Sequence, residues 1–266
     1  MKTSTLQDVA RVANVSTATV SRTLSNPVVV SESTRRRVAD AVKATGYRIN
    51  HAARNLRTQR AHSVLVLLPD LANPFFSAIL EGISRVLARQ GYSMLIASTQ
   101  HVHDSGERLI DYLDDARADG MIVLDGGLET DVVEMLAAAS QAERILFACE
   151  WVEDANFPSV RCENRTGTRI AVNHLYGLGH TKIAHITGPI GNVLGQTRKE
   201  AFVAELADLG LELKAEWIMT GDFTLAAGCL AAQEWIAMKD RPTAVFCASD
   251  QLAMGFIAEI SRHDFK

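Results

Sequence analysis

Residues 15–22 bring together side chains that could bind nucleic acid. Their sequence is Val-Ser-Thr-Ala-Thr-Val-Ser-Arg. The guanidinium of Arg22 matches the O6 and N7 acceptors of guanine, so Arg22 is the best candidate for reading a base. Hydroxyl groups donate hydrogen bonds to phosphate, and the candidates are Ser16, Thr19, Ser21 and Thr34, although each could instead cap a helix. The first hypothesis is therefore a nucleic-acid-binding segment.

The charge distribution supports this hypothesis. The 266 residues carry a net charge of −4, but residues 1–60 alone hold eleven Lys or Arg and three Asp or Glu. The rest of the chain holds 16 basic and 28 acidic residues. Clustered cations neutralise phosphate, so a small basic module for nucleic acid is expected beside a large acidic one. A solvated cationic face is the simpler alternative.

No motif in the sequence predicts catalysis. Gly177-Leu178-Gly179 lacks the third glycine of a dinucleotide site and precedes a predicted strand, so it is typical of a helix end. His101 and His103 could hold a metal ion, but no further ligands with zinc-like spacing follow in the sequence. A phosphate-binding loop and a Gly-x-Ser-x-Gly motif are missing. We expect no enzyme, no catalytic residue, no metal and no cofactor.

Two short helices are predicted to position the basic segment. Thr5 can cap a helix over residues 6–13, with Asp8 as its acidic partner and apolar residues along one face. Asn14-Val15 interrupts this helix, because asparagine tolerates a left-handed backbone. Ser16 can cap a second helix that runs to about Leu24. Two helices with so tight a turn form a helix-turn-helix, whose second helix enters the major groove.

These motifs resemble the DNA-binding headpiece of the LacI/GalR family of bacterial transcriptional regulators. The resemblance rests on Thr5-Leu6-Gln7-Asp8-Val9-Ala10 and residues 15–22, and continues through Val30-Ser31, Thr34-Arg35, Val38, Gly46-Tyr47 and Ala53-Arg54-Asn55-Leu56. It implies that Thr17 and Ala18 face the base edges together with Arg22. Arg35 would join the hydroxyl residues on the DNA backbone.

The resemblance also implies a hinge that enters the minor groove. Its contact residues would be Ala53, Asn55 and Leu56. Leu56 would act as the wedge that opens a base step and bends the operator. Such a helix is marginal alone and should order beside a partner and DNA.

From Val64 onward, short apolar runs alternate with longer amphipathic stretches. The predicted strands are 64–68, 93–97, 121–124, 145–148, 182–186, 217–219 and 244–247, and the predicted helices are 76–90, 105–117, 130–141, 165–178, 197–209, 225–238 and 250–261. This alternation predicts an α/β fold with parallel sheets covered on both faces, and ligands beyond the carboxyl ends of the strands. The expected fold class is an all-α helix-turn-helix headpiece followed by an α/β core. By the resemblance, that core is periplasmic-binding-protein-like, with two doubly wound parallel-sheet subdomains.

The loops after these strands hold the effector residues that the resemblance implies. Phe75, Phe76 and Phe223 would stack on a small molecule, Arg198 would bind it bidentately, and Asn73 and Asp250 would complete the site. Outside the family, Phe75 and Phe76 would be more typical of a core staple, and Asp250 of a helix N-cap.

The chain is expected to act in the cytoplasm. Residues 1–11 hold no apolar stretch typical of a secretory signal, and the longest apolar runs, such as 64–69, are too short to cross a bilayer. The four cysteines, Cys149, Cys162, Cys229 and Cys247, lack Cys-x-x-Cys spacing, so reduced structural thiols are expected.

Together these observations predict a sequence-specific transcriptional regulator, expected to be a repressor. It would bind palindromic double-stranded operator DNA as a homodimer and respond to a nucleoside, purine or sugar effector, with most similarity to the family's nucleoside-responsive branch. The predicted domains are a headpiece at 1–49, a hinge at 50–61 and core subdomains at 62–160 and 161–266. The alternatives are a DNA-binding dimer without effector response and a transport-type solute-binding protein.

The second core subdomain is expected to be incomplete. The family continues with further strands after residues 250–261, so residues 161–266 would be a truncated subdomain with an unpaired sheet edge. Impaired effector closure is expected of such a fragment. Cooperative melting and ordinary effector binding by the 266-residue chain would contradict this expectation.

Overall fold

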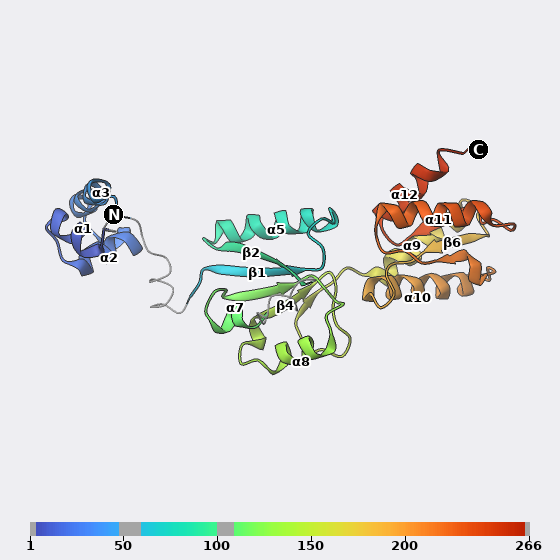
Figure 1. Ribbon diagram of the computed structural model, residues 1–266, viewed down its shortest axis with the longest axis horizontal. Helices are drawn as coiled ribbons and strands as arrows, with labels where there is room; N and C mark the ends of the chain where they lie inside the picture. Colours follow the sequence, from blue (N-terminus) through green and yellow to red (C-terminus); the bar gives the residue numbers. More distant parts are fainter. Residues whose placement is uncertain (1–3, 48–59, 100–108, 264–266) are drawn as a thin grey trace. The chain divides into compact units, whose positions relative to one another are not determined.

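The computed structural model describes residues 4–47, 60–99 and 109–263. The chain divides into two compact units, Met1–Gln59 and Arg60–Lys266 (Figure 1). The first unit is helical, and the second alternates strands with helices. The expected fold class, an all-α headpiece followed by an α/β core with parallel sheets, is confirmed.

The described part of the first unit is a three-helix headpiece. Its helices are α1 (Leu6–Ala13), α2 (Thr17–Ser25) and α3 (Glu32–Thr45), with a 3-10 turn at Pro27–Val29 between the last two. One apolar side chain from each helix lies at the centre of its core: Val9, Val20 and Val38, each with no exposed surface. This core fixes the relative orientation of the three helices.

The expected helix ends are present in the headpiece. Thr5 Oγ1 accepts a hydrogen bond from the amide of Asp8, whose carboxylate in turn accepts from the amide of Thr5, as in a capping box. Asn14 ends α1 with a left-handed backbone at φ 49°, and Gly46 ends α3 at φ 63°. The predictions from local sequence are therefore confirmed for Thr5, Asp8 and Asn14.

Among the described residues, five parallel strands form the first sheet of the second unit, in the order β2-β1-β3-β4-β5. They are β1 (Ser63–Leu68), β2 (Ser93–Ser98), β3 (Gly120–Val123), β4 (Ile145–Ala148) and β5 (Ser159–Val160). Helix α5 (Phe75–Arg89) covers one face, and α7 (Asp111–Asp114) and α8 (Thr130–Ala138) lie on the other (Figure 1).

Strand β1, which lies between β2 and β3, is buried on both faces. Leu65 and Leu67 pack into the cluster that contains Leu136 of α8, whereas Val66 and Leu68 pack with Phe76 of α5. Alternate residues of a strand point to opposite faces, so each face needs its own apolar set. This is why the sequence of β1 is an unbroken apolar run.

Three parallel strands form the second sheet, in the order β7-β6-β8. The strands are β6 (Ile183–Ile186), β7 (Ile218–Met219) and β8 (Ala244–Cys247), and the helices are α9 (Asn164–Gly177), α10 (Val193–Asp208), α11 (Leu225–Ala237) and α12 (Asp250–Ile260). Helices α11 and α12 pack closely (Figure 1). A Cβ atom on Gly255 would lie 2.0 Å from the Leu225 carbonyl oxygen, so only glycine permits this approach.

Most predicted elements lie within two residues of those observed, with informative exceptions. Helix α10 begins four residues before the predicted start, because Asn192 caps it by accepting the amides of Leu194 and Gly195. The two-residue strand β5 was not predicted, since so short a strand has no periodicity. Of the helix predicted over 105–117, only Asp111–Asp114 is helical among the described residues, and residues 100–108 lie outside them.

Candidate DNA-binding surface and effector site

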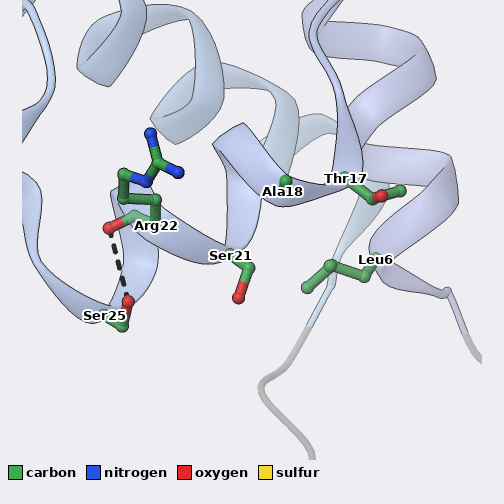
Figure 2. A pocket seen from close by; sticks show the side chains of 6 residues that line it. All are labelled: Leu6, Thr17, Ala18, Ser21, Arg22 and Ser25. Carbon is green, nitrogen blue, oxygen red and sulfur yellow. Dashed lines mark hydrogen bonds between the residues drawn. The ribbon is translucent and has the colours of Figure 1, made fainter.

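The exposed side of α2 forms a concave surface with the start of α1 (Figure 2). Its lining residues are Leu6, Thr17, Ala18, Ser21, Arg22 and Ser25. The three predicted base-reading residues, Thr17, Ala18 and Arg22, are all exposed and all belong to this surface. One helix face thus offers a guanidinium, a hydroxyl and a methyl group, the kinds of group that distinguish base pairs in a major groove.

Contacts at both ends of the turn hold α2 in place. Ser16 Oγ accepts a hydrogen bond from the Thr19 amide at 3.1 Å. Arg37 Nη2 donates to the carbonyl oxygens of Ala13 at 2.7 Å and Asn14 at 2.8 Å, which ties α3 to the end of α1. Sequence reasoning missed this role, because nothing local distinguishes Arg37 from the two arginines before it.

Several of the predicted phosphate-contacting hydroxyls already bond within the headpiece. Ser16 Oγ and Thr19 Oγ1 lie 2.9 Å apart, and Ser31 Oγ donates to Thr34 Oγ1 at 3.0 Å. A hydroxyl has one donor hydrogen and two acceptor lone pairs, so these bonds use only part of its capacity. Ser21 is half-buried.

Arg35 and the hinge complete the predicted DNA contacts. Arg35 is half-buried on α3. Ala53, Asn55 and Leu56 lie outside the described residues. Their contacts with the DNA backbone and the minor groove stay predictions.

The two phenylalanines at the start of α5 have different surroundings. The Phe75 ring is 50% exposed, whereas the Phe76 ring is 4% exposed and packs in the core beneath β1. The rings meet edge to face with centroids 5.2 Å apart. Asn73 Oδ1 accepts the Phe75 amide at 3.0 Å and so shapes the loop. The burial of Phe76 favours its core interpretation, and Phe75 is the ring that can meet a ligand.

Arg198 lies in α10 beside the carboxyl ends of β6 and β8. Its Nε donates to Asn164 Oδ1 at 2.9 Å, and its Nη1 donates to the carbonyl oxygen of Ala248. Burial lowers the pKa of the guanidinium, and the nearby Glu150, Cys162 and Asp250 act in the opposite direction. A guanidinium has five N–H donors, so a partly buried Arg198 keeps donors for a polar ligand.

Glu150 is a buried carboxylate near Arg198. It is 5% exposed, its Oε2 accepts the Gly126 amide at 2.9 Å, and its Oε1 accepts Asn192 Nδ2 at 3.0 Å. Burial raises the pKa of Glu150, while the two hydrogen bonds oppose that rise. Sequence reasoning did not include Glu150, Asn164 or Asn192 in the site. The only available signal was position directly after a strand or at a helix start.

Phe223 and Asp250 occupy the other loops predicted to bind an effector. Phe223 has a left-handed backbone at φ 65°. Its ring lies so close to Gly188 that a Cβ atom added to Gly188 would be 2.2 Å from Cζ of Phe223. Asp250 is exposed at the first position of α12. Ser249, rather than Asp250, caps that helix by accepting the Leu252 amide.

The described residues contain neither a membrane-spanning helix nor a metal-binding cluster. No helix there is long and apolar enough to span a membrane. Within the same ranges, no three His, Cys, Asp or Glu residues are grouped so that they could hold a metal ion. His101 and His103 lie outside the described residues.

Family models match both units of the chain. Residues 5–50 match the model of bacterial regulatory proteins of the lacI family. Residues 61–263 match the model described as periplasmic binding proteins and sugar binding domain of LacI family.

Individual proteins match over nearly the full chain. The transcriptional repressor CytR of Escherichia coli K12 is 36% identical over 98% of this chain and 76% of its own length. The transcriptional repressor PurR of Vibrio cholerae M66-2 is 31% identical over 97% of this chain and 76% of its own length. Among solved structures, the crystal structure of the lac repressor dimer bound to operator and the anti-inducer ONPF is similar to this chain, with a TM-score of 0.86. Its sequence is 27% identical, and the match covers 98% of this chain and 78% of the lac repressor chain. The chain belongs to the LacI family of bacterial regulatory proteins.

Proposed function

We propose that this chain is a transcriptional repressor that reads operator DNA with the exposed face of α2. The observation that carries the proposal is the shared concave surface of Thr17, Ala18 and Arg22 on a capped helix (Figure 2). In the major groove, Arg22 donates to guanine O6 and N7, and the Ala18 methyl contacts a thymine methyl. The basic charge of residues 1–60 adds affinity for any duplex.

The backbone contacts hold this helix in register without reading sequence. Ser16, Thr19, Ser21, Thr34 and Arg35 supply hydroxyl and guanidinium donors for phosphate oxygens. Ala53, Asn55 and Leu56 enter the minor groove, where Leu56 wedges a base step and bends the operator.

The proposed operator is palindromic because the protein binds as a homodimer. Two symmetry-related headpieces occupy major-groove half-sites about one helical turn apart. The structural similarity to a lac repressor dimer bound to operator supports this arrangement. The proposed site of action is the cytoplasm, and the protein acts by binding and not by catalysis.

The proposed effector is a nucleoside, purine or sugar. Arg198 and the buried Glu150 offer a cation and an acceptor for polar groups, while Phe75 and Phe223 offer aromatic surface for stacking. Asn73 follows β1, Asp250 begins the helix that follows β8, and both complete the proposed set. Effector binding changes DNA affinity, and the same coupling free energy makes DNA change effector affinity.

Selection from a randomised duplex library at moderate salt tests both halves of this proposal. We expect a two-fold symmetric motif whose recovery changes when one nucleoside, purine or sugar is added. A motif that no compound changes would leave a DNA-binding dimer without effector response. Salt-sensitive binding without any motif would overturn the operator proposal.

A further inference from the structure

Two cysteines follow the ends of the neighbouring strands β4 and β5. The strands are parallel with Ala148 opposite Val160, and the Cys149 amide donates to the Val160 carbonyl oxygen at 2.9 Å. Cys162 follows two residues after Val160. If the ladder continued regularly past this pair, strands about 4.8 Å apart with a rise of about 3.3 Å per residue would place the two α-carbons about 6 Å apart. Disulfide-bonded cysteines have α-carbons at this separation.

The backbone of Cys149 turns sharply out of the strand. Its φ is 66°, and the Glu150 amide donates back to the Ala148 carbonyl oxygen at 2.9 Å, which closes a γ-turn around Cys149. A left-handed backbone is unfavourable for a residue with a Cβ atom, and such residues concentrate at functional sites. In a continued ladder the two side chains would point to opposite faces, and the turn ends this alternation at Cys149.

The two thiols share their surroundings with Arg198. Cys162 and Arg198 both act electrostatically on the Cys149 thiol, in opposite directions. Asn164 connects the groups through hydrogen bonds: its Nδ2 donates to the Cys162 carbonyl oxygen at 2.9 Å, and its Oδ1 accepts Arg198 Nε at 2.9 Å. Cys162 is exposed and Cys149 is half-buried. An oxidant from solvent therefore reaches Cys162 more readily.

We propose that Cys149 and Cys162 are a redox modification site that a hydroperoxide converts to an intramolecular disulfide. The Cys162 thiolate attacks the peroxide, the O–O bond breaks, and Cys162 becomes a sulfenic acid as hydroxide leaves. The Cys149 sulfur then attacks the Cys162 sulfur, the S–S bond forms, and the S–O bond breaks to release water. Two thiols are oxidised, one hydrogen peroxide is reduced to water, and a dithiol reductant reverses the reaction.

The regulatory consequence rests on the proposed function. Glu150 and Asn164 follow the two cysteines closely in the chain, and Asn164 holds Arg198 directly. A disulfide between Cys149 and Cys162 restrains the two segments that carry these groups, and we expect it to lower effector affinity. Cytoplasmic disulfides are typically transient and redox-sensing, which matches this use.

Peptide mapping tests the modification independently of DNA or effector binding. Trypsin cleaves after Arg144, Arg161 and Arg165, so it places Cys149 in peptide 145–161 and Cys162 in peptide 162–165. After hydrogen peroxide and thiol alkylation of the folded chain, we expect these two peptides to be joined, with near-complete loss of alkylation at both cysteines. A dithiol reductant should restore both alkylated peptides.

Variants assign the crosslink and expose the alternatives. Cys149→Ser and Cys162→Ser should each abolish the joined peptides, whereas the matched control Cys229→Ser should leave them unchanged. Continued alkylation of both cysteines in the wild-type chain would overturn the proposal, as would stable over-oxidation of Cys162 without a crosslink. Joining of two copies of peptide 162–165 would show an intermolecular bond and would also overturn it. A disulfide without any operator motif would leave the redox site intact and refute only the proposed function.

Discussion

Asn192 Nδ2 donates a hydrogen bond to Glu150 Oε1 across 3.0 Å, and this contact joins the loop before α10 to the loop after β4. The same carboxylate accepts the Gly126 amide, so one buried side chain holds three loops at the carboxyl ends of two sheets. Because Asn192 also caps α10, the start of the helix that carries Arg198 depends on Glu150.

Replacing Glu150 with glutamine should make the variant more stable relative to the wild type as the pH rises. Burial raises the folded-state pKa of Glu150, so wild-type stability is greatest below the unfolded pKa and is lost as the pH rises through the folded one. A neutral glutamine has no such dependence. Urea unfolding from about pH 4 to about pH 8 measures the difference.

Glu200→Gln is the matched control for this prediction. Hydrogen bonds from Arg165 and Gln196 lower the pKa of Glu200, so its contribution is present at neutral pH and lost on acidification. The stability difference for this variant should change in the opposite direction with pH. If the free energy of unfolding changed with pH in the same way for Glu150→Gln and the wild type, the raised pKa of Glu150 would be contradicted.

Gly188→Ala should weaken effector binding by about tenfold or more. The added methyl group would overlap the Phe223 ring and force it away from the backbone of residue 188. Titration calorimetry with the compound recovered from the operator selection measures the loss. Gly167→Ala is the control: its Cβ atom meets nothing within 4 Å, and helix propensity should stabilise the chain by about 0.5–1 kcal/mol. Equal effector affinity in both variants would remove Phe223 from the site.

His185 should make the chain acid-sensitive. Its ring is fully buried between Phe202 and Phe246, and burial lowers its pKa from the usual 6.5 to about 4. As the pH falls, His185 is protonated in the unfolded chain at a higher pH than in the folded chain. The free energy of unfolding is therefore unaffected above pH 6.5 and decreases by about 3 kcal/mol in total as the pH falls to about 4.

His185→Phe keeps a ring in this stack and should flatten the pH dependence. Among the described residues, Nε2 of His185 has no hydrogen-bond partner, so the variant loses only the contact of Nδ1 with the Phe246 carbonyl oxygen. Chemical denaturation across the same pH range is the measurement. A variant that loses as much stability in acid as the wild type would show that other groups are responsible.

Arg22→Ala should weaken binding to the selected operator by about 1–3 kcal/mol and relax the sequence preference at one position of each half-site. Arg35→Ala should weaken binding to the operator and to a random duplex by the same factor, because phosphate contacts carry no sequence information. Binding isotherms on both duplexes at several salt concentrations separate the two cases. Equal losses on operator and random DNA for Arg22→Ala would remove its base-reading role.

The headpiece could be predicted in detail because its signals are local. The capping box of Thr5 and Asp8 and the left-handed Asn14 each depend on residues within one helical turn. The alternation of apolar strands and amphipathic helices likewise predicted parallel sheets, since period-2 and period-3.6 patterns follow from backbone geometry. The sequence by itself therefore determined most of the elements and their order, although not β5 or the extent of α7.

Only the tertiary structure decided which side chains meet across the chain. Phe75 and Phe76 are adjacent and identical in type, yet one is half exposed and the other is buried beneath β1. Arg37, Asn164 and Glu150 have partners between 24 and 42 residues away. Local periodicity cannot encode such contacts, because they depend on how the sheets and helices pack and on which buried polar groups must then find a hydrogen-bond partner.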